Sequence, residues 1–262
     1  MKFRTALKGD AEVIRLLSRF PQRIGRTLSS LVRQEARGLA VELARTTRPS
    51  GFSMRAQKAG EGAVARDIGK VFATPDQAYE ALQRTDPQSA GRFWAHVTNR
   101  RFARARKALA GSSSAWADLP VGRLEPDLHR GSRRNGKVRR SRPAQVVTSR
   151  RTLEIYTARI QRRVGFAKGV WISAARAIGG RVRRAAKWVM RHRQAPGTAI
   201  VKTGDRPSVT LVSRLDYMEE VTTSSGIRLA LDAAAGRLRL ALATSLRAVQ
   251  QRTQQGLRRR AG

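Results

Sequence analysis

The sequence has no cysteine, which excludes a disulfide framework and a thiolate metal site. Aromatic residues make up only 5%, and this scarcity favours modest helical packing over a large sheet sandwich. No run of about 18 apolar residues is free of charge, and the opening MKFRTALKGDAEVIRLL has no continuous apolar stretch like that of a signal peptide. We therefore expect a soluble protein made in the cytoplasm, without a membrane partner.

Acidic residues are also scarce. The 262 residues include 54 Lys plus Arg against 18 Asp plus Glu, which gives a formal net charge of +36. A compact fold with this charge repels itself unless a polyanion or an acidic partner neutralises it. Apolar residues make up 40%, enough for one core of moderate size together with extended parts.

Patterns typical of catalysis or cofactor binding are missing as well. The three histidines, His96, His129 and His192, have no close carboxylate partners in the sequence, and His129 and His192 sit among arginines that repel a metal cation. The glycines of KAGEGAVA and RAIGGRVRR lack the spacing of a phosphate-binding loop. We expect no catalytic residues, no metal, no cofactor and no small-molecule substrate.

Hydrophobic spacing predicts several helices. Apolar residues recur every three or four positions from Pro21 onward, which indicates a helix of about 25 residues that ends near Arg48-Pro49. Within residues 46–83, the glycine-rich first half is interpreted as a loop, and Thr74-Pro75 as the start of a short helix. Helical spacing is also found over 89–110 and 153–178.

Alternating residues predict the strands. Residues 3–7 indicate a short strand, and TAIVKTGDRPSVTLVS, at residues 198–213, indicates a β-hairpin. A long C-terminal helix follows, with Ser224 or Ser225 as its expected cap. The fold class predicted is α+β, with long helices packed on a small antiparallel sheet and a long basic insertion or arm. The expected parts are an α+β core of 1–50 and 197–262, a mostly helical insertion of 51–110, an extended basic arm or linker of 111–147, and a helical segment of 148–196.

The middle of the chain contains the most distinctive local feature, which we call the basic strip. Seven cations fall within thirteen residues without an acid between them: Arg130, Arg133, Arg134, Lys137, Arg139, Arg140 and Arg142. A flexible arm on nucleic-acid phosphates, docking on an acidic protein surface and a solvated loop all explain such a strip. Aromatic residues do not alternate with the arginines, so any contact with nucleic acid is expected at the backbone of double-stranded DNA.

The only tight acidic cluster is in LDYMEEV, with Asp216, Glu219 and Glu220. A nuclease or glycosidase uses such carboxylates for metal binding or proton transfer. A solvated strand end or salt bridges at an interface explain them equally well. We favour the interface, formed by Asp216, Tyr217, Glu219 and Glu220.

The order of elements is similar to that of a phage protein family. MKFRTALKG, the helix in FPQRIGRTLSSLVRQEARGLAVELART, the hairpin in AIVKTGDRPSVTLVSRLDYMEEV and the terminal helix together resemble the small tail-component family of long-tailed bacteriophages. In that family an Ala-rich helix follows the first strand, and a Tyr-Ala-x-x-Val-Glu-like stretch, to which residues 215–221 are similar, precedes the last helix. The chain departs from the family by its long insertion.

The resemblance implies a non-enzymatic virion protein at the head-to-tail junction, or neck, made in the host cytoplasm. Its partners would be further copies of itself in a homo-oligomeric ring, other neck, portal, adaptor or tail proteins, and the DNA that passes through the channel. The rival interpretation from charge alone is a sequence-nonspecific nucleic-acid-binding protein, nucleoid-like or RNA-associated. Catalysis by the acidic cluster is a third hypothesis.

Overall fold

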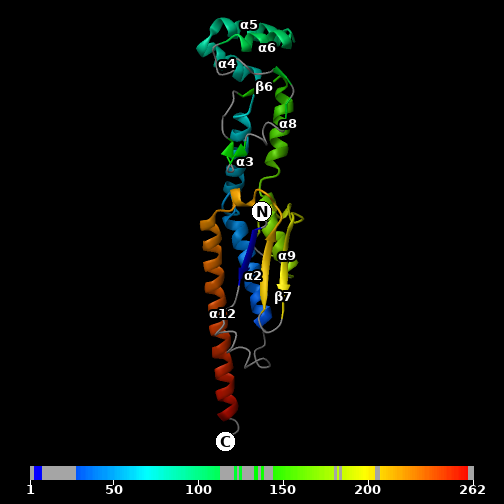
Figure 1. Ribbon diagram of the computed structural model, residues 1–262. Coiled ribbons are helices and arrows are strands. Elements are labelled where there is room, and N and C mark those ends of the chain that lie inside the picture. The colour runs from blue at the N-terminus through cyan, green and yellow to red at the C-terminus, as the bar shows by residue number, and fades with distance from the viewer. Residues whose placement is uncertain are drawn as a thin grey trace. The chain divides into compact units, whose positions relative to one another are not determined.

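The computed structural model describes residues 3–7, 28–112, 121–122, 124–125, 133–134, 137–138, 144–179, 182, 185–203 and 207–258 (Figure 1). They belong to two compact units: a core unit of residues 1–57 and 165–262, and an inserted unit of residues 58–164. The second boundary falls inside residues 148–196, which the sequence analysis treats as one helical segment. The two halves of that segment therefore pack in different units.

The core unit contains a three-stranded antiparallel sheet in the order β1 (Phe3–Leu7), β8 (Ser208–Ser213), β7 (Gly197–Lys202). Leu211 of β8 pairs with Thr5 on one side and with Ala199 on the other. Along β8, Val209 and Leu211 are buried at alternate positions, as expected for one face against a helical layer. The predicted first strand and late hairpin are both confirmed.

The long helices described in the core unit are α2 (Leu28–Thr46), α9 (Phe166–Ala177) and α12 (Ser224–Arg258). α2 and α9 pack against each other and both contact β8. α12 lies along α2 and buries one stripe at helical spacing, namely Ala230, Ala234, Leu238 and Leu242. Glu35 of α2, itself buried, accepts a 3.0 Å hydrogen bond from Arg237 Nε of α12. Because a buried carboxylate needs a partner, this ion pair sets how α12 sits on α2.

The inserted unit is mostly helical. α3 (Met54–Gly69) leads into β2 (Phe72–Ala73), and then come α4 (Pro75–Thr85), α5 (Pro87–Thr98), α6 (Phe102–Ala110), β3 (Val121–Gly122), β6 (Gln145–Val147) and α8 (Arg150–Gln161). β2, β6 and β3 form a small parallel sheet with β6 in the centre, which the sequence analysis did not anticipate.

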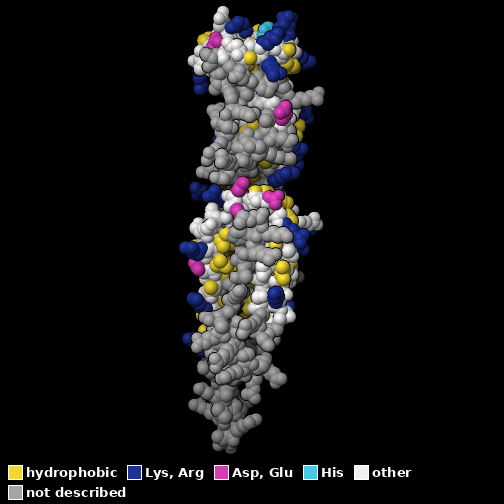
Figure 2. All heavy atoms as spheres, in the orientation of Figure 1, with side chains coloured by type: hydrophobic (Ala, Val, Ile, Leu, Met, Phe, Trp, Pro, Cys, Tyr) yellow, Lys and Arg dark blue, Asp and Glu magenta, His cyan; other side chains and the backbone are white. Residues whose placement is uncertain are grey.

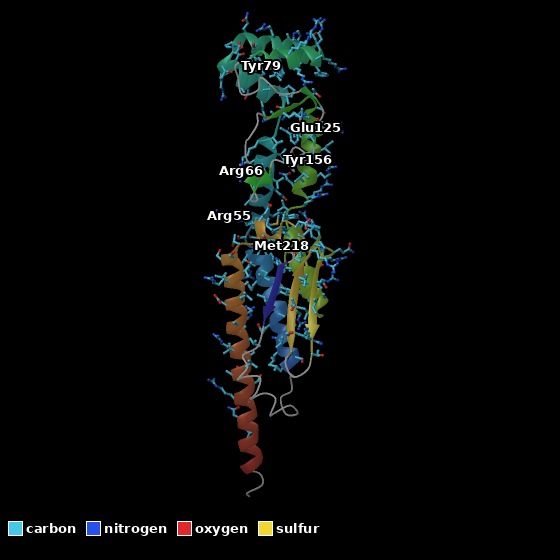
Figure 3. All side chains as sticks on the ribbon, in the orientation of Figure 1. Arg55, Arg66, Tyr79, Glu125, Tyr156 and Met218 are labelled. Carbon is cyan, nitrogen blue, oxygen red and sulfur yellow. The ribbon has the colours of Figure 1, made fainter. Side chains whose placement is uncertain are left out.

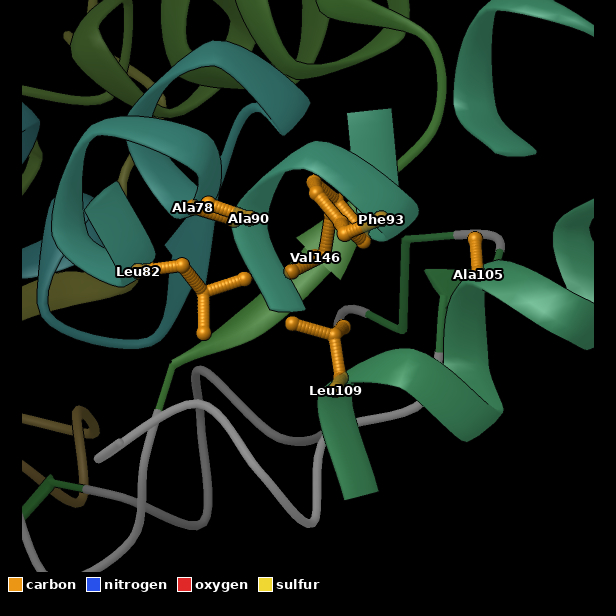
Figure 4. Packing of buried hydrophobic residues seen from close by; sticks show 7 residues of the cluster. All are labelled: Ala78, Leu82, Ala90, Phe93, Ala105, Leu109 and Val146. Atoms are coloured by element: carbon orange, nitrogen blue, oxygen red, sulfur yellow. The ribbon is translucent and has the colours of Figure 1, made fainter. Parts of the chain in front are cut away.

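Two hydrophobic clusters hold this unit together. In the first, α4, α5 and α6 close around Phe93, Leu82 and Leu109, and Val146 of β6 completes the cluster (Figure 4). In the second, Phe72 and Tyr156 meet edge to face with 6.1 Å between ring centroids. The start of α4 is as predicted: Thr74 and Gln77 form a reciprocal capping box, and Pro75 occupies the first turn.

Two local predictions are wrong. The segment expected to be a loop after Thr46 contains α3, which begins where the Ser53 hydroxyl accepts a 3.2 Å hydrogen bond from Ala56 N. Its glycines suggested a loop, but Ile68 is buried and Val64 packs beside it, so tertiary burial outweighs the low helix propensity. At the start of α12, Thr223 rather than a serine provides the cap, accepting from Gly226 N at 3.1 Å.

The expected basic arm of residues 111–147 is corrected at its end. Residues 144–147 are buried, and Gln145–Val147 form the central strand of the parallel sheet. A short run of small and β-branched residues gains more from burial between two strands than from an extended exposed path. Any arm is therefore confined to residues before Ala144.

Replacing Gly197 by Ala should lower the free energy of unfolding of the core unit. A Cβ atom at Gly197 would overlap the carbonyl oxygen of Val170, because β7 lies directly against α9 there. Overpacking of this kind costs about 1–3 kcal/mol or more of the free energy of unfolding, measured by urea titration. Gly236→Ala is the matched control: a Cβ there meets nothing within 4 Å, and the helix should gain about 0.5–1 kcal/mol. Equal stability of both variants would contradict the close packing of α9 on β7.

Candidate functional site

The basic strip is described only in part. Its backbone forms a two-stranded antiparallel ladder between β4 (Arg133–Arg134) and β5 (Lys137–Val138), with Arg134 and Lys137 as register partners. The other four predicted contact residues, Arg130, Arg139, Arg140 and Arg142, lie outside the described residues. This register places two cations of the strip, Arg134 and Lys137, at opposing backbone positions.

The predicted interface residues lie together on the surface of the core unit. Tyr217 precedes the short helix α11 (Met218–Val221), and Asp216, Tyr217, Glu219 and Glu220 are all exposed around it. Within the described ranges, no ion pair involves the three carboxylates. We call these four residues the acidic patch. Figure 2 shows acidic side chains at the end of the core unit near Met218, which is labelled in Figure 3.

The acidic patch has a fixed backbone. Met218 is 1% exposed and anchors α11 in the core. The chain just after it is tied to the end of α2: Arg48 N donates to Val221 O at 2.9 Å, and the hydroxyls of Thr47 and Thr222 lie 3.1 Å apart. Because Met218 and these hydrogen bonds hold α11 from the inside, its outward carboxylates are presented at a constant position.

A second set of cations was missed by the sequence analysis. Arg100, Arg101, Arg104, Arg106 and Lys107 are all exposed on α6 and on the turn that precedes it. No Asp or Glu occurs between Pro87 and Ser112. The lack of acids is visible in the sequence. The cations of this stretch were nevertheless not recognised as a site, because apolar residues lie between them and because the basic strip has a higher density of charge.

The core unit also holds a buried amine that sequence reasoning did not find. Lys168 on α9 has no exposed surface, and its Nζ donates to the carbonyl oxygen of Ala44 at 2.7 Å and to that of Arg45 at 3.4 Å. Phe52 and Trp188 lie beside it, with ring centroids 5.3 and 5.8 Å from Nζ. In the sequence, Lys168 is a single charged residue within an apolar run, and no other pattern indicates that it is buried.

Lys168 completes the C-terminus of α2. The last carbonyls of a helix have no partner within it, and its C-terminal end attracts positive charge. Here Lys168 Nζ donates a hydrogen bond to the carbonyl oxygen of Ala44. Thr47 Oγ1 donates to Leu43 O at 2.7 Å and accepts from Trp171 Nε1 at 3.1 Å. These donors come from α9 and from the residue that follows α2. The buried end of α2 is therefore satisfied by neighbouring side chains instead of water.

Burial lowers the pKa of Lys168 from 10.5 to about 7. A lysine with a lowered pKa is often a catalytic base or nucleophile. Because its amine is enclosed and already donates to backbone carbonyls, Lys168 has no access to a substrate. Its chemistry here is structural, as a cap of α2.

The structure describes two of the three histidines. His192 accepts a 3.1 Å hydrogen bond from Arg191 Nε and meets the Phe166 ring edge to face. His96 lies on α5, and His129 is outside the described residues. Searching the described part of the chain finds no group of three or more His, Asp or Glu able to hold a metal ion. A membrane-crossing helix is likewise not found among those residues.

Comparison with known proteins identifies no relative. No protein family, curated protein or solved structure matches the chain.

Lys168→Met should destabilise the protein more at pH 9.5 than at pH 6.5. The unfolded lysine binds a proton up to about pH 10.5, whereas the folded one releases it near pH 7, so the stability of the wild-type protein rises with pH across this window. At pH 9.5 the variant loses about 1–3 kcal/mol, because the α2 carbonyls lose a donor. At pH 6.5 the loss is smaller, because the wild type then carries a buried charge.

Urea unfolding at both pH values measures this difference. Lys187→Met, which changes an exposed lysine on α10 (Lys187–Met190), is the control and should leave the pH dependence unchanged. The same loss of stability at both pH values in Lys168→Met would contradict a lowered pKa at this amine.

Proposed function

We propose that the chain is a non-enzymatic structural protein of the neck of a long-tailed bacteriophage, where it forms a ring between head and tail. The observation that carries the proposal is the packing of the core unit. The elements that resemble the phage family, at both ends of the chain, fold together as one α+β unit, and the inserted unit lies between them in the sequence. This arrangement favours an assembly module formed by the two ends, to which the insertion adds a further surface.

The acidic patch is suited to a ring contact. In a ring, each subunit contacts its two neighbours through two different, complementary surfaces. In a chain of charge +36, a fixed exposed cluster with three of the 18 acidic residues is complementary to almost any basic surface of a neighbouring copy. Tyr217, which is 40% exposed, adds an aromatic side chain of the kind enriched at interfaces.

A second candidate function is sequence-nonspecific binding of nucleic acid. The excess of 36 positive charges and the acid-free stretch from Pro87 to Ser112 favour it. The two functions differ in what the protein does by itself. Stable rings or incorporation into particles support the neck protein, whereas salt-sensitive duplex binding by a monomer or dimer, without particle incorporation, supports the rival.

Charge reversal of the acidic patch tests the ring contact. Glu219→Lys with Glu220→Lys should shift the protein from ring to monomer in native mass spectrometry and reduce joining of heads to tails, because attraction becomes repulsion at every contact. Both side chains are exposed, so the fold should be unaffected, as judged by circular dichroism.

The matched control makes the same charge change in the inserted unit. Glu125→Lys with Glu154→Lys alters two exposed carboxylates there, of which Glu154 pairs with Arg150 at the surface. This control should assemble normally. Rings formed equally well by both double variants would contradict the acidic patch as the subunit contact.

A further inference from the structure

The turn between α5 and α6 has an unusual backbone. Arg101 N donates to His96 O at 2.8 Å and Arg100 N donates to Val97 O at 3.0 Å, the pair of hydrogen bonds of a Schellman motif at the end of α5. The residue at its left-handed position is Arg100, with φ of 55°, where glycine is the usual choice. A residue with a side chain in this conformation lowers the stability of the fold by about 1 kcal/mol relative to glycine, so glycine would be more stable than arginine at position 100.

The outer side of α6 consists mostly of cations and alanine. Ala105 and Leu109 are fully buried, and at 3.6 residues per turn Arg104, Arg106 and Lys107 fall outside this buried stripe. The other exposed residues of α6 are Phe102, which is 37% exposed, Ala103 and Ala110. Because methyl groups are short, the cations extend farther from the helix than the alanines do.

Among the residues that the structure describes, no ion pair involves Arg100, Arg101, Arg104, Arg106 or Lys107. Elsewhere in the described part, arginines do pair with acids, as in Arg237–Glu35 and Arg150–Glu154. Figure 2 shows Lys and Arg side chains gathered over α5 and α6. The resulting positive potential is not reduced by neighbouring acids.

We propose that this surface, the α6 basic face of Arg100, Arg101, Arg104, Arg106 and Lys107, binds the phosphate backbone of duplex DNA. α6 has nine residues and is about 14 Å long, comparable with the roughly 12 Å width of the DNA major groove. Its cations can therefore reach the phosphates on both sides of that groove. DNA binding by this face is independent of whether the chain forms a neck ring.

An acidic protein is a poorer fit to the α6 basic face. Protein interfaces have an apolar centre, often aromatic, within a polar rim. Nucleic-acid interfaces are more polar and far more positive, and the exposed residues of α6 are cations and alanines apart from Phe102. Single-stranded nucleic acid fits less well too, because its bases stack on several exposed aromatic rings. Within the part of this unit that the structure describes, Tyr79 and Trp94 pack on each other with 5.2 Å between ring centroids, and Phe102, 37% exposed, is a single ring on α6.

Fluorescence anisotropy with a labelled 30-bp duplex of arbitrary sequence tests the site on the purified full-length chain. The variant Arg104→Gln, Arg106→Gln, Lys107→Gln keeps good helix formers at exposed positions. It should bind at least about tenfold more weakly at 100 mM NaCl. The slope of log K against log salt should fall by about 3, one for each lost phosphate contact.

Two controls remove the same charge elsewhere. Arg151→Gln, Arg162→Gln, Arg163→Gln changes exposed arginines of α8 and the turn after it, and Arg139→Gln, Arg140→Gln, Arg142→Gln changes the basic strip. Each should change affinity by less than about threefold. Arg100→Gly adds an independent test, because it should weaken binding while raising the melting temperature by relieving the left-handed backbone.

Three outcomes would overturn the assignment. Equal losses in the three triple variants would show diffuse charge attraction, and loss only in the strip variant would move the site to residues 130–142. Polyglutamate that displaces the duplex as well as unlabelled DNA does, at equal charge concentration, would instead identify an acidic protein as the partner of this face. Circular dichroism of each variant separates lost binding from lost folding.

Discussion

The enclosed contact between Lys168 and the C-terminus of α2 is the interaction on which the core unit depends. α2 ends inside the protein, where Lys168 donates to the carbonyl of Ala44 and the Thr47 hydroxyl donates to that of Leu43. The same few residues join four parts of the unit: the end of α2, α9 through Lys168 and Trp171, the loop after α2 through Phe52, and the chain just after α11 through Thr222. The acidic patch is thereby held by the network that closes the core. Burying an amine costs free energy, but its hydrogen bonds make one arrangement of these elements preferable to others.

Most elements of the core could be predicted from the sequence, because their periodicity agrees with their burial. The β7–β8 hairpin alternates, and the buried stripe of α12 repeats every three or four residues. The predictions failed where tertiary contacts outweighed local preference. α3 is glycine-rich yet forms a helix whose Ile68 is buried, and residues 144–147 follow a basic stretch yet form a central strand. In the parallel sheet, the pairing of β2 with β6 joins segments about seventy residues apart, and no local pattern specifies such pairing.

The candidate surfaces could be predicted less completely. Asp216, Tyr217, Glu219 and Glu220 were identified because acids are rare in this chain, and the structure places them together on a fixed backbone. The α6 basic face was missed because its five cations are interspersed with apolar residues in the sequence. The cations and the buried apolar residues fall on different faces once the segment forms a helix. Lys168 gave no signal, since its role depends on carbonyls more than a hundred residues away. The core is held by one polar network, and the acidic patch and the α6 basic face lie in separate units.

The neck assignment is the central claim, and the most direct measurement is a mass-spectrometric inventory of purified, nuclease-treated phage particles separated into heads and tails. A few copies of the chain per particle, recovered at the head-to-tail junction, are the result that the account predicts. Absence of the chain from particles, with recovery on cellular DNA or RNA instead, would contradict it and leave the nucleic-acid-binding protein as the better description.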